Sequence, residues 1–296
     1  MTREISLGRW VMRDEMAELW RVAFQDSEEA TQHFFNYRFQ PENSLVYLVD
    51  GKVSSMLHML PVELVVGEQL EPAQYIYGAA TWPVHRGVGH MGALLAAAAA
   101  CGQWRGEKYS LLLPMNPALY LYYAKHQYQP FFQTRYVNLT REEMQSYAKE
   151  SNTAMAAPTM VELAAERREL LATYPGSVIW GEQHLAYAAA LYELYGGKFI
   201  SLTEPGGSAY AMGINRGNGE VELVEVVATP ALLGPLAREI VRQMPAVSYY
   251  LRLPAFGELW AGQGEVRTQG MLKALTDEGL LSLQGAAYPY LGLTLD

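Results

Sequence analysis

The stretch Thr81-Trp82-Pro83-Val84-His85-Arg86-Gly87-Val88-Gly89-His90-Met91 decides how this chain is interpreted. It follows a strand predicted over residues 75–81 and precedes an alanine-rich helix predicted over residues 91–104, which carries no charged side chain. A strand, a glycine turn and a helix N-terminus can hold a phosphate, because glycine lets backbone N–H groups approach the anion. Arg86 adds a charge-assisted donor. The pattern predicts a phosphate site, and a tight strand-to-helix turn is the purely structural alternative.

The glycine spacing excludes two common nucleotide-binding motifs. It is not the Gly-x-Gly-x-x-Gly of dinucleotide folds, and the chain has no Gly-Lys-Ser/Thr of a P-loop NTPase. An apolar helix with no polar face is expected to be buried.

Length and charge narrow the class of protein. The 296 residues suffice for two domains of roughly 150 residues each. Half of the chain is hydrophobic and 18% is charged, which argues against a largely disordered protein. The net charge of −9 disfavours a nucleic-acid partner and suits a positively charged small substrate better.

The sequence contains no pattern typical of a membrane span, a signal peptide or a disulfide. The longest apolar run, residues 93–101, is shorter than the ~20 residues of a membrane span. The N-terminus has no signal-peptide pattern. A single cysteine, Cys101, excludes an intrachain disulfide and a cysteine-based metal cluster. We therefore expect a cytoplasmic protein with no membrane association and no metal.

The remaining pattern predicts a mixed α/β organisation. Asp50-Gly51 predicts a hairpin turn between strands at residues 44–49 and 53–60. Further strands are expected at residues 62–66, 109–113 and 128–137, the last of which closes the first domain. In the second half, Ala228-Thr229-Pro230 stands between a strand and a helix as Ala80-Thr81-Trp82-Pro83 does in the first. Residues 251–256 likewise repeat the position of residues 111–116. The two halves form a faint internal repeat.

The glycine turn, followed by Leu94-Leu95, resembles the acetyl-CoA pyrophosphate loop of the GNAT acetyltransferase superfamily, Pro-x-x-Arg/Gln-x-x-Gly-x-Gly/Ala. Arg86 and Gly89 match this loop. Met91 stands where glycine or alanine is usual, which is similar to the Eis-like (enhanced intracellular survival) branch. Asn116 and residues 122–128 resemble the superfamily's Asn followed by Phe-Tyr-x-Lys-x-Gly-Phe, with Gln127 in place of the glycine. The resemblance covers residues 10–137.

This resemblance implies a tandem GNAT fold whose second copy is degenerate. The expected boundaries are residues 1–145 for an acetyl-CoA-binding GNAT domain, 146–158 for a linker and 159–296 for the degenerate domain. Residues 229–233 lack the arginine and the glycines of the first loop. The second domain is expected to wall the acceptor groove or to mediate self-association.

The resemblance also implies roles for individual residues. Backbone groups of Ala79, Ala80 and Thr81 would pair with the pantetheine arm of acetyl-CoA. The pyrophosphate would lie against the loop and the first helical turn, formed by Arg86, Gly87, Val88, Gly89, His90, Met91 and Gly92. Asn116 is either a further cofactor residue or an N-cap before Pro117.

The general acid implied for the CoA thiolate is Tyr123, because a phenol with a pKa near 10 keeps its proton at neutral pH. Its structural alternative is a packing aromatic. The general base is less defined, since residues 75–81 contain no carboxylate. His58 is the side chain assigned here for its ordinary pKa near 6.5, with a core histidine as the alternative.

Other candidates for the base are Glu63, Asp26, Glu28 and a water relay. The resemblance adds the C-terminal carboxylate, here that of Asp296, because in Eis-like enzymes the chain's own C-terminal carboxylate enters the active site. The resulting hypothesis is an acetyl-CoA-dependent N-acetyltransferase. Its acceptor would be a primary amine of a small molecule or peptide, which attacks the thioester directly. A non-catalytic CoA-binding sensor is the first alternative. An aminoacyl-tRNA-dependent transferase is the second, and the acidic charge weighs against it.

Overall fold

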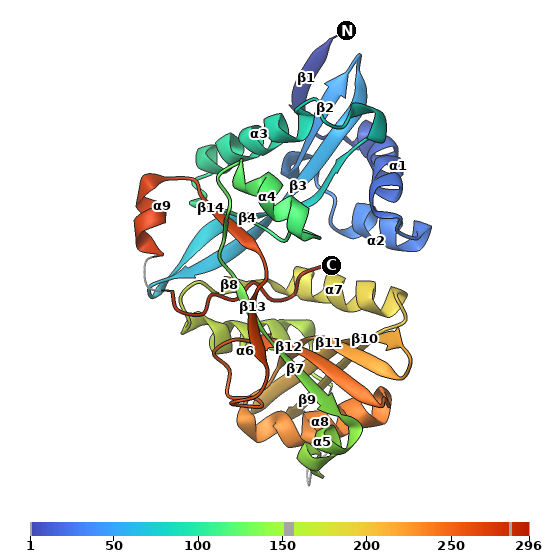
Figure 1. Cartoon of the computed structure of the whole chain (residues 1–296), viewed down its shortest axis with the longest axis vertical. Coiled ribbons are helices and arrows are strands. Elements are labelled where there is room, and N and C mark those ends of the chain that lie inside the picture. The colour runs from blue at the N-terminus through green and yellow to red at the C-terminus, as the bar shows by residue number, and fades with distance from the viewer. Residues whose placement is uncertain (1, 151–156, 284–285, 296) are drawn as a thin grey trace. The chain divides into compact units, whose positions relative to one another are not determined.

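The structure, a computed structural model, describes residues 2–150, 157–283 and 286–295 of the chain. The chain divides into two compact units, each built from two separate stretches of sequence (Figure 1). Unit 1 comprises Met1–Phe131 and Gly270–Gln284, and unit 2 comprises Phe132–Gln269 and Gly285–Asp296.

Unit 1 is built on a mixed sheet in which the strands follow the order β1-β2-β3-β4-β5-β14-β6. Neighbouring strands are antiparallel except for β4 and β5, which are parallel. The mixed α/β class expected from the sequence is confirmed. The strands are β1 (Arg3–Leu7), β2 (Ser44–Val49), β3 (Lys52–Val66), β4 (Gln69–Thr81), β5 (Tyr109–Leu112), β6 (Gln129–Pro130) and β14 (Met271–Ala274).

Helices cover both faces of this sheet. Successive residues of a strand point to opposite faces, and β3 shows the alternation. Leu57 and Met59 pack with residues of α3 and α4, whereas His58 between them contacts rings of α1 and α2. The helical segments of unit 1 are η1 (Trp10–Met12), α1 (Arg13–Phe24), α2 (Glu28–Tyr37), η2 (Pro41–Asn43), η3 (Pro83–His85), α3 (His90–Trp104), α4 (Pro117–Ala124) and α9 (Asp277–Ser282).

The hairpin predicted at Asp50-Gly51 is confirmed. Both residues have positive φ, +49° and +78°, as a tight hairpin turn requires. The return strand β3 is longer than predicted, because it continues through Pro61 instead of stopping there. Its pairing with β2 ends at His58, so the missing N–H of Pro61 removes no bond to β2.

Helix α3 forms where the sequence predicts it, but it is not buried all round. Leu94, Leu95 and Ala98 are buried against the sheet. Ala96 and Ala100 are exposed, and Trp104 is 88% exposed. The expectation of full burial was wrong, because small alanines leave one side of the helix apolar without requiring a partner.

Unit 2 is built on a second mixed sheet in the order β13-β7-β12-β11-β10-β9. Its strands are β7 (Gln133–Thr140), β9 (Lys198–Glu204), β10 (Gly207–Gly217), β11 (Glu220–Val227), β12 (Ser248–Pro254) and β13 (Glu265–Thr268), with a short β8 (Val178–Ile179) outside this order. Its helical segments are α5 (Arg141–Tyr147), α6 (Met160–Ala172), α7 (Glu182–Leu194), η4 (Pro230–Leu232) and α8 (Leu233–Gln243).

The division into units differs from the expected boundaries at residues 145 and 159. The segment expected to close the first sheet, residues 128–137, is divided between the two sheets. Residues 129–130 form β6 of the first sheet, whereas residues 133–137 belong to β7, which pairs with β12 in the second. Strand β14, which the sequence did not predict, completes the first sheet beside β5. The linker expected over residues 146–158 includes residues 151–156, which lie outside the described residues.

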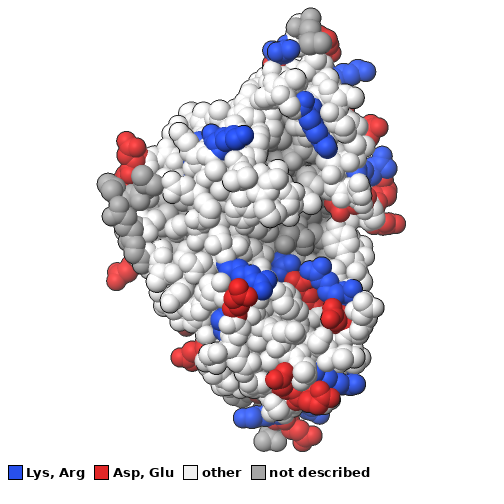
Figure 2. All heavy atoms as spheres, in the orientation of Figure 1, with Lys and Arg blue, Asp and Glu red and all other residues white. Residues whose placement is uncertain are grey.

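The internal repeat is visible in the structure. In unit 2, β11, η4, α8 and β12 follow one another as β4, η3, α3 and β5 do in unit 1, and β11 and β12 are again parallel. None of the helices among the described residues is both long and apolar enough to cross a bilayer. Figure 2 shows charges of both signs in small groups on the visible face, without a continuous basic surface.

Candidate functional site

The candidate site lies where the parallel strands β4 and β5 of unit 1 separate. Their pairing runs from Ala73–Tyr109 to Tyr75–Leu111 and stops there, although β4 continues to Thr81. A bulge in β4 near Gly78, whose φ is +59°, follows directly. A bulge bends its strand and interrupts pairing. The edge of residues 76–81 that faces away from β3 is therefore left unpaired with β5.

Glycine at position 78 has a second reason, because the strand passes close to a tryptophan. A Cβ atom at Gly78 would lie 2.3 Å from Cζ3 of Trp20 and 3.0 Å from Cδ2 of His58. No side chain fits at that distance. The bulge that turns β4 away from β5 therefore depends on this glycine.

The glycine turn leads from β4 into α3. Gly87 and Gly89 have φ of +78° and +92°, and a Cβ atom at either position would meet nothing within 4 Å. The turn is exposed, and the N–H groups of the first turn of a helix have no partner within the helix. Backbone donors at the positive end of α3 are thus uncovered by side chains, which fits an anion such as a pyrophosphate.

Arg86 lies within this turn and is exposed. Its Nε donates to the carbonyl of Thr81 at 3.1 Å, which holds the side chain against the end of β4. Its two terminal nitrogens have no partner among the described residues. The guanidinium therefore presents free donors beside the start of α3.

The side chain of His90, the first residue of α3, is buried and anchors the helix. His90 is 5% exposed, its Nδ1 lies 2.8 Å from Oγ of Ser54, and its ring stacks on Tyr47 at 4.0 Å. Burial, with the nearby positive charges of His85 and Arg3, lowers the pKa of His90. Its side chain fixes the helix start to the sheet, so only its backbone N–H can serve a ligand.

The other predicted loop residues differ in their surroundings. Val88 is 63% exposed, and Met91 packs against the hydrophobic cluster under α3. A Cβ atom on Gly92 would lie 2.7 Å from Cε1 of His126, so glycine here admits the imidazole ring at the end of α4. Burial, together with the charges of Lys273 and Lys125, lowers the pKa of His126.

Asn116 caps α4. Its side-chain oxygen accepts from the N–H of Leu119 at 3.1 Å, and Pro117 occupies the first helical position. This confirms the structural alternative for Asn116. Its side chain is exposed, and its cofactor role stays a prediction.

Tyr123 points from α4 into the cluster that covers this face of the sheet. It is 8% exposed and shares the cluster with Tyr128, and Ala79 of β4 and Met91 of α3 pack against the same cluster. Burial, and to a smaller extent Tyr122, raises the pKa of Tyr123 to about 12. No described residue forms a hydrogen bond with its hydroxyl. The phenol is thus protonated and its donor is uncommitted.

His58 lies on the opposite face of the sheet from Tyr123, among rings of α1 and α2. It is 1% exposed, and the centroids of the Phe34 and Trp20 rings lie 4.7 Å and 6.0 Å from its own. Its Nδ1 lies 2.8 Å from Oγ of Ser44, while its Nε2 is buried without a partner in the described structure. Burial lowers its pKa to about 3. This environment fits a core histidine, the alternative reading, better than the base assigned from the sequence.

The other base candidates are placed elsewhere or engaged. Glu63 pairs in register with Pro72, roughly 30 Å along β4 from Thr81. Asp26 accepts from Nε1 of Trp20 at 2.7 Å. Glu28 forms an ion pair with Arg21 at 2.9 Å, while Asp296 lies outside the described residues.

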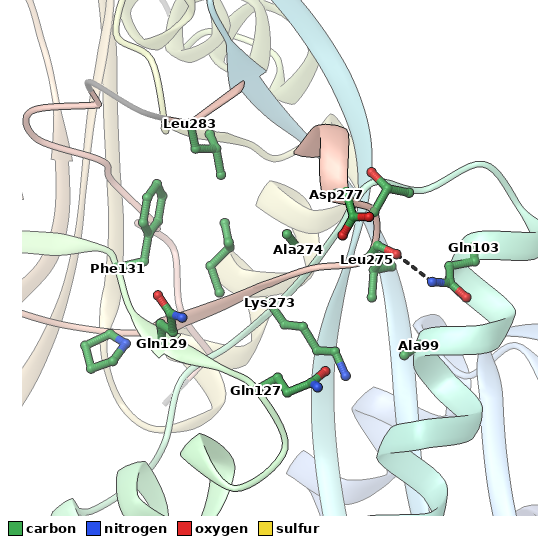
Figure 3. Close-up of a pocket in the computed structure, with 13 residues that line it drawn as sticks. Ala99, Gln103, Gln127, Gln129, Phe131, Lys273, Ala274, Leu275, Asp277 and Leu283 are labelled. Atoms are coloured by element: carbon green, nitrogen blue, oxygen red, sulfur yellow. Dashed lines mark hydrogen bonds between the residues drawn. The ribbon is translucent and has the colours of Figure 1, made fainter. Parts of the chain in front are cut away.

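Sequence reasoning missed a large cavity in unit 1. It has a volume of about 810 Å³ and lies between the second half of α3, β6 and β14 (Figure 3). Gln103 donates to the carbonyl of Leu275 at 2.5 Å on its wall, and Lys273 and Gln127 point into the same region. None of the residues predicted for acetyl-CoA lines this cavity. The sequence did not predict this cavity, because no local pattern in β14 indicates that the strand pairs with the first sheet.

Comparisons with known proteins show a related domain and a related fold. Residues 11–125 match the sequence profile of the acetyltransferase (GNAT) domain. No curated protein matches the chain. Among solved structures, the chain is similar to a GCN5-related N-acetyltransferase from Anabaena variabilis, with a TM-score of 0.76 and 14% identity over 95% of this chain and 75% of that one.

Two further structures are similar over a comparable share of the chain. Eis1 from Mycobacterium abscessus has a TM-score of 0.71 and 14% identity over 94% of this chain and 75% of that one. A tandem GNAT protein from the clavulanic acid biosynthesis pathway has a TM-score of 0.54 and 13% identity over 93% and 99%. At such identities the likeness shows the fold, which is that of tandem GNAT proteins.

Proposed function

Because the chain carries a GNAT acetyltransferase domain within a tandem GNAT fold, we propose that it transfers an acetyl group from acetyl-CoA to a primary amine. The acceptor is an amine of a small molecule or a peptide. The observation that carries the proposal is the separation of β4 from β5 directly before the glycine turn. One strand end thus presents unpaired backbone, and the helix after it presents anion-binding donors.

The residues of this turn fit the pyrophosphate of acetyl-CoA. Gly87 and Gly89 expose backbone N–H groups, and the terminal nitrogens of Arg86 offer charge-assisted bonds. Residues 79–81 offer an extended backbone edge to the amides of the pantetheine arm. Holding both ends of the thioester fixes its carbonyl, which lowers the entropic part of the barrier to attack.

In this reaction the amine nitrogen loses a proton and the departing sulfur gains one. The amine nitrogen forms a bond to the thioester carbonyl carbon, the carbon–sulfur bond breaks, and the sulfur leaves as a thiolate. Tyr123, whose pKa of about 12 keeps the phenol protonated at neutral pH, gives its proton to that thiolate. The resulting phenolate, a stronger base than the thiolate, takes a proton from water and is restored for the next turnover. The nitrogen loses its extra proton to water. His58, with a pKa of about 3 and no exposed ring nitrogen, has no part in this step.

Calorimetric titration with acetyl-CoA tests the cofactor site. We expect micromolar binding by the wild type, lost in Arg86→Ala and in Gly89→Asp, because the first removes donors and the second places a carboxylate beside the phosphates. Gly51→Asp is the matched control, since Gly51 also has a positive φ, +78°, and open space around it. It should cost similar stability and leave binding intact.

Turnover is tested separately, by screening an amine library for release of free CoA. A wild type that does not bind acetyl-CoA contradicts the proposal. Binding without turnover of any amine supports the second candidate, a CoA-binding protein without catalysis. That candidate is favoured by one observation, the absence of a carboxylate on β4 beyond Pro72.

A further inference from the structure

Unit 2 holds a cavity at the place where its own parallel strands separate. The pairing of β11 with β12 ends at Leu223–Leu251, and β11 has an extra residue, Val224, directly after it. The cavity has a volume of about 250 Å³ and is lined by the strand ends beyond that point, including Ala228 and Leu253. It therefore occupies in unit 2 the position that the acetyl-CoA site is proposed to occupy in unit 1.

The wall of this cavity is mostly apolar. Leu170, Val226, Ala228 and Leu253 contribute aliphatic side chains, and the ring of Phe256 stacks on Tyr174 with centroids 3.6 Å apart. A dry cavity of roughly 150 Å³ already binds benzene. The space in unit 2 is large enough for a substituted ring or a short branched chain.

One charged side chain on the wall is buried. Arg135 is 6% exposed and lines the cavity. Its two terminal nitrogens donate to the carbonyls of Trp260, Gln263, Gly257 and Leu259 at 2.7–3.2 Å. Its Nε–H, the fifth donor of a guanidinium, has no partner among the described residues. The charge itself has no carboxylate partner there either.

The other buried arginines of unit 2 have the carboxylate partner that Arg135 lacks among the described residues. Arg167 donates to the carboxylate of Glu225 at 3.0 Å, and Arg252 donates to Glu222 at 2.6 Å. Buried charges in proteins are ordinarily paired in this way. Glu258 also lines the cavity, but it is exposed, and water screens its charge. Consistently, burial lowers the pKa of Arg135, and no neighbouring carboxylate offsets it.

We propose that the cavity of unit 2 binds a small carboxylic acid with an apolar body, whose carboxylate meets the guanidinium of Arg135. The apolar body occupies the space between the diverging strands. A phosphorylated ligand does not fit this site, because residues 229–233 supply neither a glycine turn nor an arginine at the start of α8. The site is separate from the proposed acetyl-CoA site, and its ligand needs no thioester.

Calorimetry with matched probes tests the charge requirement. The probes are 3-phenylpropanoate, its neutral amide and 3-phenylpropylamine. We expect the acid to bind, the amide to bind about tenfold more weakly, and the amine not to bind, because only the acid pairs with a buried cation. If the wild type does not bind the acid at millimolar concentration, or binds acid and amide equally, the proposal is overturned.

Two variants locate the site. Ala228→Leu fills the cavity and should abolish binding of the acid, whereas Ala261→Leu, on the exposed turn after Trp260, should not. Arg135→Gln should weaken binding of the acid about tenfold more than binding of the amide, because both ligands lose the bonds that hold residues 257–263 and only the acid also loses the cation. Binding that survives Ala228→Leu overturns the assignment. Acetyl-CoA titration of the same samples keeps this result separate from the proposed function, since loss of either binding leaves the other measurable.

Discussion

The two units contain the same four elements in the same order, yet they use them differently. In each unit a strand bulges just after its parallel pairing ends, a 3-10 turn follows, and a helix and a parallel strand complete the motif. In unit 1 the turn into the helix is glycine-rich and exposed. In unit 2 the same turn reads Thr229-Pro230-Ala231-Leu232-Leu233, and Leu232 is buried.

This difference shows which parts of the motif belong to the fold and which to the ligand. The bulge and the diverging strands persist in both units, so they are properties of the architecture. The glycines and Arg86 occur only in unit 1, so they are the features that a phosphate requires. Unit 2 retains the separation of its strands, which leaves a mostly apolar cavity, and it carries buried ion pairs in place of the phosphate-binding features.

The largest expected effect is the loss of folding stability when a buried arginine of unit 2 is replaced, compared with an exposed arginine of unit 1. Arg167 is 1% exposed and pairs with Glu225, which also accepts from Tyr210 at 2.6 Å. Arg167→Met leaves that carboxylate buried without its cation and should lower the free energy of unfolding by about 3–5 kcal/mol. Arg86→Ala, in the exposed turn, should change it by less than about 0.5 kcal/mol. Urea denaturation measures both.

The control is an exposed ion pair in the same unit. Arg267 and Glu265 lie 2.8 Å apart and are both more than half exposed, so Arg267→Met should cost less than about 1 kcal/mol. Comparable losses for Arg167→Met and Arg267→Met would show that the buried pair is not what stabilises unit 2. Acetyl-CoA affinity, measured on folded Arg167→Met, should remain that of the wild type.

The next effect concerns catalysis in unit 1. Tyr123→Phe removes the proton donor and should lower kcat about 100-fold while leaving the dissociation constant of acetyl-CoA unchanged. Tyr122→Phe, one residue earlier on α4 and less buried, is the matched control and should retain most activity. Because the pKa of Tyr123 is about 12, its proton is present across the neutral and moderately alkaline range. A fall in wild-type kcat between pH 8 and 10 that Tyr123→Phe abolishes would contradict this assignment.

The glycine turn, the hairpin at Asp50-Gly51 and the cap at Asn116 could all be predicted from the sequence, because local backbone geometry selects those residues. The exchange of strands between the units could not. Strand β14 has four residues, and its place beside β5 is fixed by tertiary pairing rather than by local pattern. The surroundings of His58 were hidden for the same reason, since the rings around it come from two other elements.

A smaller effect, the pH dependence of the free energy of unfolding, tests whether His58 is a core histidine or a base. The folded-state pKa of His58 is about 3, against 6.5 when unfolded, so between these pH values the unfolded chain binds one more proton. Stability from this site is therefore full above pH 6.5 and is lost as the pH falls, by about 1.4 kcal/mol per pH unit. His58→Asn removes that dependence, so its unfolding free energy should fall less steeply than that of the wild type between pH 6.5 and 5.

The activity profile of the same variant gives the second readout. If His58 packs only in the core, folded His58→Asn keeps the wild-type dependence of kcat on pH. If an acidic limb near pH 6 disappears in the variant, His58 acts as a base and the structural interpretation fails.

The smallest effect concerns the position where the family motif has glycine and this chain has Gln127. Gln127 has a φ of +70°, so the backbone retains the conformation that glycine favours although the residue has changed. Gln127→Gly relieves this strain and should raise the free energy of unfolding by about 0.5–1 kcal/mol. The gain is reduced by the greater freedom of glycine in the unfolded chain.

Two variants serve as controls. Gln25→Gly, at φ +59° after α1, should behave in the same way. Gln129→Gly, in strand β6, should instead destabilise, because no left-handed conformation is relieved there. If all three variants destabilise equally in urea, the backbone at residue 127 carries no strain, and the glycine of the motif serves the ligand rather than the turn.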